Sequence, residues 1–360
     1  MKDSRQFYIA ATGMITSIGY DAAMSHAVWR AGHSAYALSG IGNRYGEPVT
    51  IASVPEQALD ELDAQISDGA EFSALRDRMT RMAIIAAREV CEKLPRKSAV
   101  PLLMVVDQQD IANANAGISQ DLEMNCSPWM QKSLSRAFDF GRASGFHALE
   151  FAFNYLFDAQ EYEYLMLGGV DSYVDERKLA KLGNEDRLLS PGSQEGFVPG
   201  EAAAFVLLTR NAQLAHAISG QLVAVSLPGI DAEPGHLYSD RPYLGEGLHQ
   251  AMTKALAHAE PSQTISRIYS SMNGEHHWAK ELGVAQLRHR HAFSDNCAVF
   301  HPADCWGDLG AATAPALMSL AFMDLADCGP GTTCLVYSSS DDAPRGAVVM
   351  EKQTLGEVQA

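Results

Sequence analysis

The sequence predicts an α/β protein built from two similar halves, with helices covering both faces of two stacked sheets. Short continuous apolar runs, such as 101–106 and 202–208, alternate with longer segments whose apolar residues recur at helical spacing. Runs of this kind are typical of strands that are buried on both faces of a parallel sheet. The same order of strand and helix signals occurs before and after residue 210. Two such halves, when stacked, give a five-layer α-β-α-β-α sandwich.

The first half is expected to begin with a strand and a helix. The apolar strand over 7–18 is interrupted by Gly13 and Gly19, and Asp21 can cap a helix that runs to about Arg30. The other elements expected in this half are a helix over 75–94, strands over 101–106, 164–167 and 202–208, and a helix over 144–159.

The second half repeats this order of elements. Its expected strands are 221–226, 267–271, 332–338 and 346–352, and its expected helices are 245–259, 276–288 and 309–327. No low-complexity linker separates the halves 1–210 and 211–360, so we expect them to share one core. In the first half, the strand over 164–167 is expected to stop at a tight turn formed by Gly168 and Gly169.

Composition limits the classes of partner and cofactor. The 360 residues carry a formal net charge of -17, which opposes binding to nucleic acid or to anionic membranes. No apolar stretch approaches the roughly 20 residues that span a bilayer, and no signal sequence is evident, so the expected location is the cytoplasm. The 6 cysteines form no CxxC pair, which argues against a disulfide framework and a zinc site. We expect no metal and no cofactor.

Five glycine-containing segments follow one another in a fixed order along the chain. Segment 142–149 reads Arg-Ala-Ser-Gly-Phe-His-Ala-Leu, and 165–172 reads Leu-Met-Leu-Gly-Gly-Val-Asp-Ser. Together they resemble the region of β-ketoacyl synthases that has Ala-Cys-Ser-Ser-Gly, a helix, and a strand ending in Gly-Gly-Val-Asp-Ser. Segments 12–16, 196–202 and 307–312 match further motifs of that family in the same order. The resemblance implies the thiolase fold over nearly the whole chain.

The same resemblance implies that the chemistry of the family is lost. It places Arg142 where a synthase has its nucleophilic cysteine, and a guanidinium group does not deprotonate to become a nucleophile. One family histidine falls near 272–274, which reads Met-Asn-Gly, and another is replaced by Asp308. The Gly-Phe-Gly-Gly loop of the family is replaced by Ser-Ser-Ser-Asp-Asp at 338–342. The resemblance therefore implies a synthase-like protein without a condensation reaction.

An arginine at the start of a buried helix needs carboxylate partners, because the helix dipole disfavours a cation there. We therefore expect a bidentate ion pair of Arg142 with either Asp308 or Glu275. The candidate pocket comprises Arg142, Ser144, Glu275, His276, Lys280, Asp304, Cys305 and Asp308. Three interpretations remain open: an ion-pair plug in a retired active site, an anion-binding site, or a new catalytic centre that draws on Glu275, His276, His277, Lys280, Glu281 and Cys305.

Simple geometry weakens the last of these interpretations. Neighbouring residues on a helix point about 100° apart, so His276 and His277 do not suit one metal ion. Lys280 and Glu281 lie four residues after these histidines, a spacing typical of solvated helix faces. The acidic neighbour of Cys305 is expected to raise the pKa of its thiol and so to lower its reactivity.

The predicted function is that of a catalytically inactive binding or accessory protein. Resemblance to thiolase-fold proteins implies a homodimer, or a heterodimer with a related subunit. The stretches 272–275 and 301–307 are similar to those of short synthase-like proteins from type VI secretion gene neighbourhoods, which implies a role beside a secreted effector. One alternative is a chain-length-factor-like subunit, with an active ketosynthase or an acyl carrier protein as partner. Another is a non-condensing enzyme for acyl thioesters, with Glu275 as base and Arg142 as oxyanion donor.

Overall fold

The computed structural model describes residues 5–67, 73–94, 99–107, 117–158, 161–191, 195–217 and 220–355. Five strands of the first half lie in the order β1-β7-β6-β4-β5. Strands β5, β4 and β6 are parallel, whereas β7 pairs antiparallel with both β6 and β1. Their bounds are β1 (Gln6–Thr16), β4 (Leu102–Val105), β5 (Ser135–Phe138), β6 (Leu165–Ser172) and β7 (Glu201–Thr209).

The second half has the same topology, which confirms the predicted duplication. Its order is β8-β13-β12-β10-β11, with parallel β11, β10 and β12 and antiparallel pairing of β13 with both β12 and β8. The bounds are β8 (Gln221–Ser226), β9 (Gly229–Ala232), which pairs with β13, β10 (Ile265–Ser270), β11 (Phe293–Phe300), β12 (Thr333–Ser339) and β13 (Pro344–Thr354). A short antiparallel contact between β1 and β8 joins the halves into an 11-stranded sheet. The expected boundary at 210/211 falls between β7 and β8.

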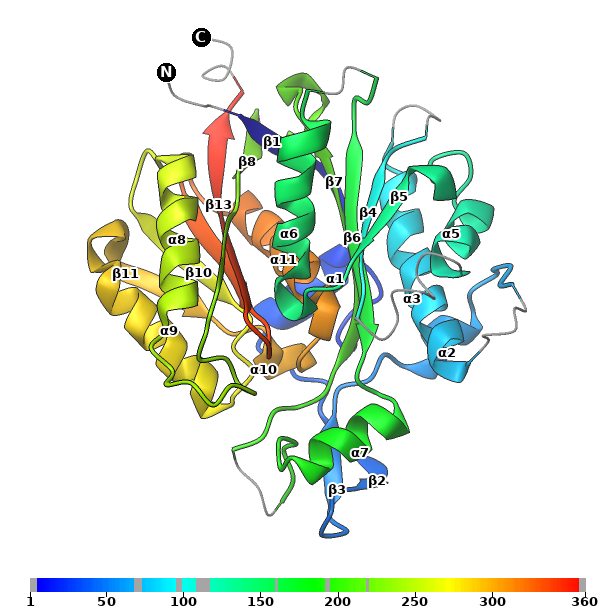
Figure 1. The fold of residues 1–360 in the computed structure, drawn as a ribbon. Coiled ribbons are helices and arrows are strands. Elements are labelled where there is room, and N and C mark those ends of the chain that lie inside the picture. Colours follow the sequence, from blue (N-terminus) through cyan, green and yellow to red (C-terminus); the bar gives the residue numbers. More distant parts are fainter. Residues whose placement is uncertain are drawn as a thin grey trace.

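The helices form three layers around these two half-sheets, as Figure 1 shows. One outer layer contains α3 (Ala74–Cys91) and α5 (Ser119–Asn125), and the opposite outer layer contains α8 (Glu246–Ala259) and α9 (His276–Arg288). Between the half-sheets lie α6 (Ser144–Phe151), which continues as a π-helical segment (Ala152–Leu156), and α11 (Thr313–Ala326). The predicted α-β-α-β-α sandwich is therefore confirmed.

Local sequence explains where these helices begin and how they pack. The Asp21 carboxylate accepts a hydrogen bond from the Met24 amide at 2.6 Å, and so caps α1 (Ala22–Arg30) as expected. Ser73 caps α3 in the same way, at 3.1 Å from the Arg76 amide. Helix α11 is buried at every position from Thr313 to Phe322, because a helix between two sheets has no face in water.

Two glycine predictions were wrong. Strand β6 runs through Gly168 and Gly169 without a turn, and β1 runs through Gly13. The reason is close packing: a Cβ at Gly168 would lie 2.1 Å from Cδ1 of Phe205, and one at Gly13 would lie 2.1 Å from the Ala86 carbonyl oxygen of α3. These glycines allow close approach of neighbouring elements rather than a change of direction.

Several short elements have no counterpart in the sequence prediction. A small lobe at the lower end of the molecule in Figure 1 contains the hairpin β2–β3 and helix α7. The elements not predicted are α2 (Glu56–Asp60), α5, α7 (Glu176–Asn184), α10 (Ala303–Trp306), β2 (Ala37–Gly42), β3 (Pro48–Ile51), β5, β9 and β11. Among the described helices, none combines the length and the apolar character that crossing a bilayer requires.

Candidate functional site

Arg142 lies at the head of α6, in the middle of the sandwich. A 3-10 turn (Gly141–Ala143) leads from β5 into α6, and Gly141 adopts a left-handed φ of 64°. Arg142 is only 2% exposed. The amide of Ala143 donates to the Ser340 hydroxyl at 3.0 Å, which fixes the turn against the loop after β12. The predicted position of the arginine at the start of a buried helix is confirmed.

Each nitrogen of the Arg142 guanidinium group donates to an oxygen of the second half. Nε donates to the Ser339 carbonyl at 2.8 Å, Nη1 donates to Asp308 at 2.6 Å, and Nη2 donates to Asp341. The guanidinium carbon lies 4.7 Å from the centre of the Trp278 ring, a cation–π contact. The predicted pair of Arg142 with Asp308 is confirmed, but it is a single hydrogen bond and not a bidentate one.

Glu275 does not pair with Arg142, so that alternative was wrong. Its carboxylate is instead held by Arg187, which follows α7 in the small lobe. Nε of Arg187 donates to Oε1 at 2.8 Å, and Nη2 donates to Oε2 at 2.9 Å. Nε and Nη2 of Arg187 thus form the planar bidentate arrangement that a carboxylate prefers. Burial would raise the pKa of Glu275, but the hydrogen bonds and charge of Arg187 outweigh it and lower the pKa.

Asp341 joins the two arginines. It accepts from Arg142 through Oδ1 and from Nη1 of Arg187 through Oδ2, the latter at 2.7 Å. Although burial opposes ionisation of Asp341, the charge of Arg142 and the hydrogen bonds of Arg187 hold its pKa well below the ordinary range. The set of Arg142, Arg187, Glu275, Asp308 and Asp341 is called the inter-half network below. Both arginines belong to the first half and all three acids to the second, so the network ties the halves together.

Neutral side chains complete the hydrogen bonding of the network. The Asn273 amide donates to Glu275 at 3.0 Å and to Asp308 at 2.8 Å. The Trp278 indole nitrogen donates to Glu275 at 2.9 Å, and the Gly310 amide donates to Asp308 at 2.9 Å. A buried carboxylate that accepts several hydrogen bonds stays ionised. The network therefore has the features of a stable polar core rather than of an open anion site.

The predicted residues on α9 separate into exposed and buried groups. His276 and Lys280 are exposed, and His276 faces Glu195 at 3.4 Å with both side chains more than three-quarters exposed. They stay outside the network. The expectation of a solvated Glu281 was wrong: its carboxylate is buried, accepts from Nε of Arg345 at 2.6 Å, and also accepts from Ser339. It lies on the inner face of α9, one turn after Trp278.

The remaining predicted residues do not reach the network either. Cys305 belongs to the central apolar core, whereas its neighbour Asp304 on α10 is exposed. The expected rise in the pKa of Cys305 is confirmed, with burial as the larger cause and Asp304 as the smaller. The Ser144 hydroxyl is buried and has no hydrogen-bond partner among the described residues. Of the eight predicted residues, only Arg142, Glu275 and Asp308 come together.

Sequence reasoning missed four residues of this site: Arg187, Asn273, Trp278 and Asp341. Asp341 lies in the Ser-Ser-Ser-Asp-Asp stretch that marked a departure from the family pattern, and Asn273 lies in the Met-Asn-Gly stretch. These two departures could have identified them. Arg187 lies in a loop without a motif, so no pattern in the sequence identified it.

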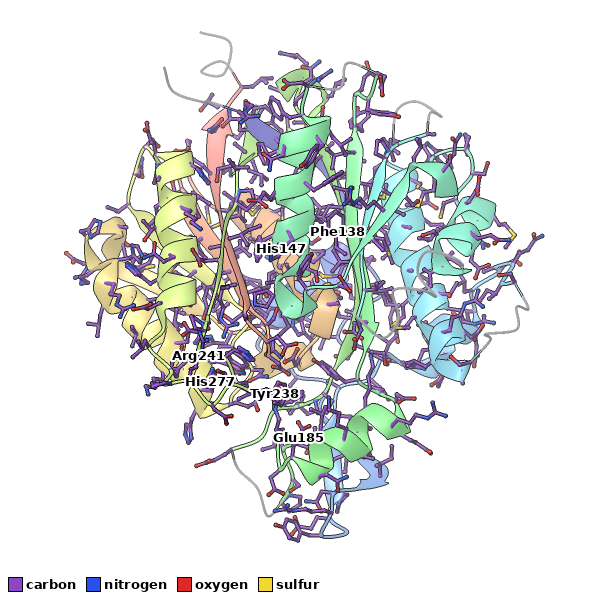
Figure 2. All side chains as sticks on the ribbon, viewed as in Figure 1. Phe138, His147, Glu185, Tyr238, Arg241 and His277 are labelled. Atoms are coloured by element: carbon purple, nitrogen blue, oxygen red, sulfur yellow. The ribbon has the colours of Figure 1, made fainter. Side chains whose placement is uncertain are left out.

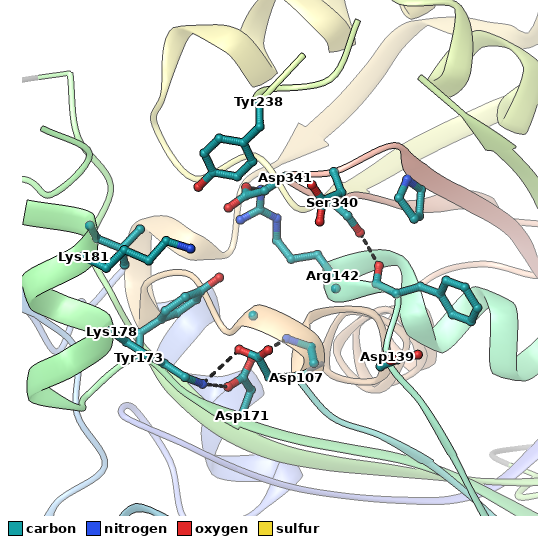
Figure 3. A pocket seen from close by; sticks show the side chains of 17 residues that line it. Asp107, Asp139, Arg142, Asp171, Tyr173, Lys178, Lys181, Tyr238, Ser340 and Asp341 are labelled. Atoms are coloured by element: carbon teal, nitrogen blue, oxygen red, sulfur yellow. Dashed lines mark hydrogen bonds and ion pairs between the residues drawn. The ribbon is translucent and has the colours of Figure 1, made fainter. Parts of the chain in front are cut away.

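A cavity of about 400 Å³ lies beside Arg142 and opens between α7, the head of α6 and the loop after β12 (Figure 3). The Lys178 side chain lies in one wall of the cavity, where it pairs with Asp107 at 3.1 Å and with Asp171 at 2.9 Å. Tyr238 receives a hydrogen bond from Arg187 at 2.8 Å and donates one to Glu185 at 3.0 Å (Figure 2).

Within the described part of the chain, no group of three or more His, Cys, Asp or Glu residues is placed to hold a metal ion.

No protein-family model matches the sequence, and no curated protein matches it. Solved structures, by contrast, do match it. The ishigamide ketosynthase/chain length factor aligns with a TM-score of 0.75 at 15% identity, over 96% of this chain and 99% of that chain. The ketosynthase from module 6 of the bacillaene synthase of Bacillus subtilis 168 aligns with a TM-score of 0.74 at 12% identity, over 96% and 72%.

A third neighbour is a ketosynthase in complex with its chain length factor from Xenorhabdus doucetiae. It aligns with a TM-score of 0.70 at 13% identity, over 96% of this chain and 98% of that chain. Sequence identities this low establish a shared fold but not a shared activity. The chain has the mixed α/β, thiolase-type fold of the ketosynthases and chain length factors.

Proposed function

We propose that this protein is a non-condensing accessory subunit, which acts by binding a partner and not by capturing an acyl group. The observation that carries the proposal is the state of Arg142: it stands at the head of α6, it is buried, and all three of its nitrogens are hydrogen-bonded within the chain. A condensing enzyme needs a thiolate at such a helix start. A guanidinium group that is tied to Asp308 and Asp341 fills the space and offers no nucleophile.

The alternative of a non-condensing acyl-thioester enzyme is less well supported. It requires Glu275 as a free base and Arg142 as a free oxyanion donor. Both Glu275 oxygens accept hydrogen bonds from Arg187, and the lowered pKa weakens the carboxylate as a base. The Arg142 nitrogens already donate to three acceptors. The geometry therefore favours a structural role for both residues.

Strand β5 and the adjacent side of α6 provide a surface for a partner. Among the described strands β5 pairs only with β4, so its other edge presents unpaired backbone groups. A shallow groove of about 690 Å³ runs between β5 and α6. Phe140 is 41% exposed and Tyr155 is 70% exposed beside it. We call this surface the β5 face and define it by Arg136, Phe138, Phe140, His147, Phe151 and Tyr155 (Figure 2 labels Phe138 and His147).

Stacked side chains make the β5 face rigid. The Phe140 and His147 rings stack at 4.1 Å, the Phe151 and Tyr155 rings stack at 4.7 Å, and the Arg136 guanidinium lies 4.1 Å over Phe151. Aromatic residues and arginine are the types that contribute most to protein interfaces. We propose that the β5 face pairs with a second copy or with a related thiolase-fold subunit. A structural neighbour, the ketosynthase from Xenorhabdus doucetiae, is in complex with its chain length factor.

Substitutions on the β5 face should separate the subunits. We expect Phe140→Asp combined with Tyr155→Glu to raise the dissociation constant of the dimer at least 100-fold, because two desolvated aromatic contacts become charges. Light scattering after size-exclusion chromatography, over a dilution series, measures this. Tyr45→Glu is the matched control, since Tyr45 is 66% exposed on the β2–β3 hairpin. A chain that stays monomeric alone and with every co-expressed ketosynthase-fold subunit would refute the pairing.

The identity of the partner is a separate proposal. A ketosynthase, its carrier protein and a secreted effector are the three candidates, the last from the similarity to proteins of type VI secretion gene neighbourhoods. Co-expression with each candidate, followed by affinity purification with and without the Phe140→Asp/Tyr155→Glu change, ranks them. The proposed location is the cytoplasm, where the six free cysteines stay reduced.

A further inference from the structure

The cavity beside Arg142 contains both paired and unpaired charges. Three cationic and five acidic side chains line it, so its formal charge is -2. Lys178 is neutralised by Asp107 and Asp171, and Arg142 by Asp308 and Asp341. These groups satisfy one another and leave little attraction for a ligand. A ligand would therefore bind to the polar groups of the lining that have no partner among the described residues.

Two donors of the cavity wall have no hydrogen-bond partner within the described parts of the chain. Lys181 of α7 points its ammonium group into the cavity, 5.9 Å from the centre of the Tyr238 ring (Figure 3). Tyr173, which follows β6, points its hydroxyl into the same space. Burial, followed by the charges of Asp308 and Asp341, raises the pKa of Tyr173 well above the ordinary value, so the phenol remains a donor. Together they form a site for a carboxylate.

Two acids of the cavity lining are unpaired within the described part of the chain. Asp139 lies just before the turn at the head of α6, on the side away from Lys181 (Figure 3). Asp342 comes from the loop after β12. Neither side chain forms an ion pair or hydrogen bond with another residue that the structure describes. A simple anion would meet the net negative charge of the lining, and a simple cation would meet Lys181.

We propose that this cavity binds a small zwitterion, with its carboxylate on Lys181 and Tyr173 and its ammonium group towards Asp139 and Asp342. Lys181 and Asp139 lie on opposite sides of the cavity in Figure 3, so the ligand's charges must be separated, as in a di- or tripeptide. A volume of about 400 Å³ lies in the range of small-molecule sites. Arg142 of the network is one of the lining residues and is itself buried. The inference goes beyond the proposed function. Asp139 and Phe140 line both this cavity and the groove of the β5 face, so peptide binding and dimer formation are measured in the same samples.

A ladder of small peptides tests the proposal on the whole chain. Isothermal titration calorimetry with glycine, diglycine and triglycine varies the separation of the charges by about 3.5 Å per residue. We expect the affinity of the best member to fall at least tenfold when its amino group is acetylated, and at least tenfold when its carboxyl group is amidated. Acetate alone and methylamine alone should bind at least 100-fold more weakly than that peptide.

Matched variants locate the binding site. Lys181→Gln and Asp139→Asn should each weaken the best peptide at least tenfold, whereas Lys280→Gln and Asp240→Asn, at exposed positions outside the cavity lining, should leave it unchanged. Thermal unfolding of each variant confirms that it is folded. Equal binding of free and capped peptides, no binding by any member at millimolar concentration, or binding that ignores Lys181 and Asp139 would each overturn the proposal. Dimer formation in the same samples reports separately on the β5 face.

Discussion

Replacing Arg142 with methionine should lower the free energy of unfolding by about 3–5 kcal/mol, the usual effect of removing one partner of a buried ion pair. Methionine fills a similar volume, but it cannot donate a hydrogen bond. Asp308 and Asp341 each lose the hydrogen bond that they accept from Arg142. Denaturant unfolding followed by circular dichroism measures the change, provided that the slope with denaturant stays constant.

Arg290→Met is the matched control for this experiment. Arg290 forms an ion pair with Asp295 at 2.7 Å, but these side chains are 62% and 91% exposed. An exposed pair of this kind contributes at most about 1 kcal/mol. Adding Asp308→Asn to Arg142→Met should recover part of the loss, because the uncompensated carboxylate is then neutral. Equal and small effects of Arg142→Met and Arg290→Met would mean that the network does not hold the halves together.

Acid should destabilise the protein strongly. The native pKa values of Asp341 and Glu275 lie below their ordinary values, and so does that of Asp324, a buried residue of α11 that pairs with Arg30 and Arg267. A carboxylate whose pKa is depressed on folding contributes stability that is complete above its unfolded pKa, near 4, and is lost as the pH falls through the native pKa. A strongly depressed carboxylate contributes about 2–3 kcal/mol. We therefore expect the free energy of unfolding to fall steeply between pH 5 and pH 2.

The slope of stability against pH measures how much of this effect comes from Asp341 of the network. Asp341→Asn should lower stability at neutral pH and flatten the acid slope, because one carboxylate that resists protonation in the native state is gone. Asp295→Asn should leave the slope unchanged, since Asp295 forms an exposed surface pair. Chemical denaturation at pH 7, 5, 4 and 3 gives both slopes. An unchanged slope for Asp341→Asn would contradict the assignment.

Most of the fold could be predicted because its strands and helices are buried. Strand β8 and helix α9 have the predicted bounds, and β7, β12 and α8 differ from prediction by one residue or a few. A long run of residues in which apolar side chains recur with a clear period can be assigned to a helix or a strand with little ambiguity. The edge strands β5 and β11 were missed because they are partly exposed and lack a continuous apolar run. The glycines in β1 and β6 were misread because tertiary packing, not local geometry, requires them.

The candidate site could be predicted only where a family motif marked it. The resemblance to β-ketoacyl synthases places Arg142 and Asp308 where that family has chemically different residues, and a buried cation requires an anion nearby. That reasoning could not choose between Asp308 and Glu275, and it did not identify Asp341, because a requirement for an opposite charge gives no distances. Arg187 emerged only from the structure: it reaches Glu275 across 88 residues of sequence from a lobe that the prediction lacked.

The most direct test of the central claim is whether an acyl group becomes attached to this chain. The purified protein is incubated with acyl-CoA and with acyl-carrier protein, beside a cysteine-dependent ketosynthase as positive control, and intact masses and peptide masses are measured. We expect an acyl adduct on the control and no adduct on the peptide that contains Arg142 and Ser144. A stoichiometric acyl group on that peptide, removed by hydroxylamine, would contradict the account of a buried arginine that has closed the active site.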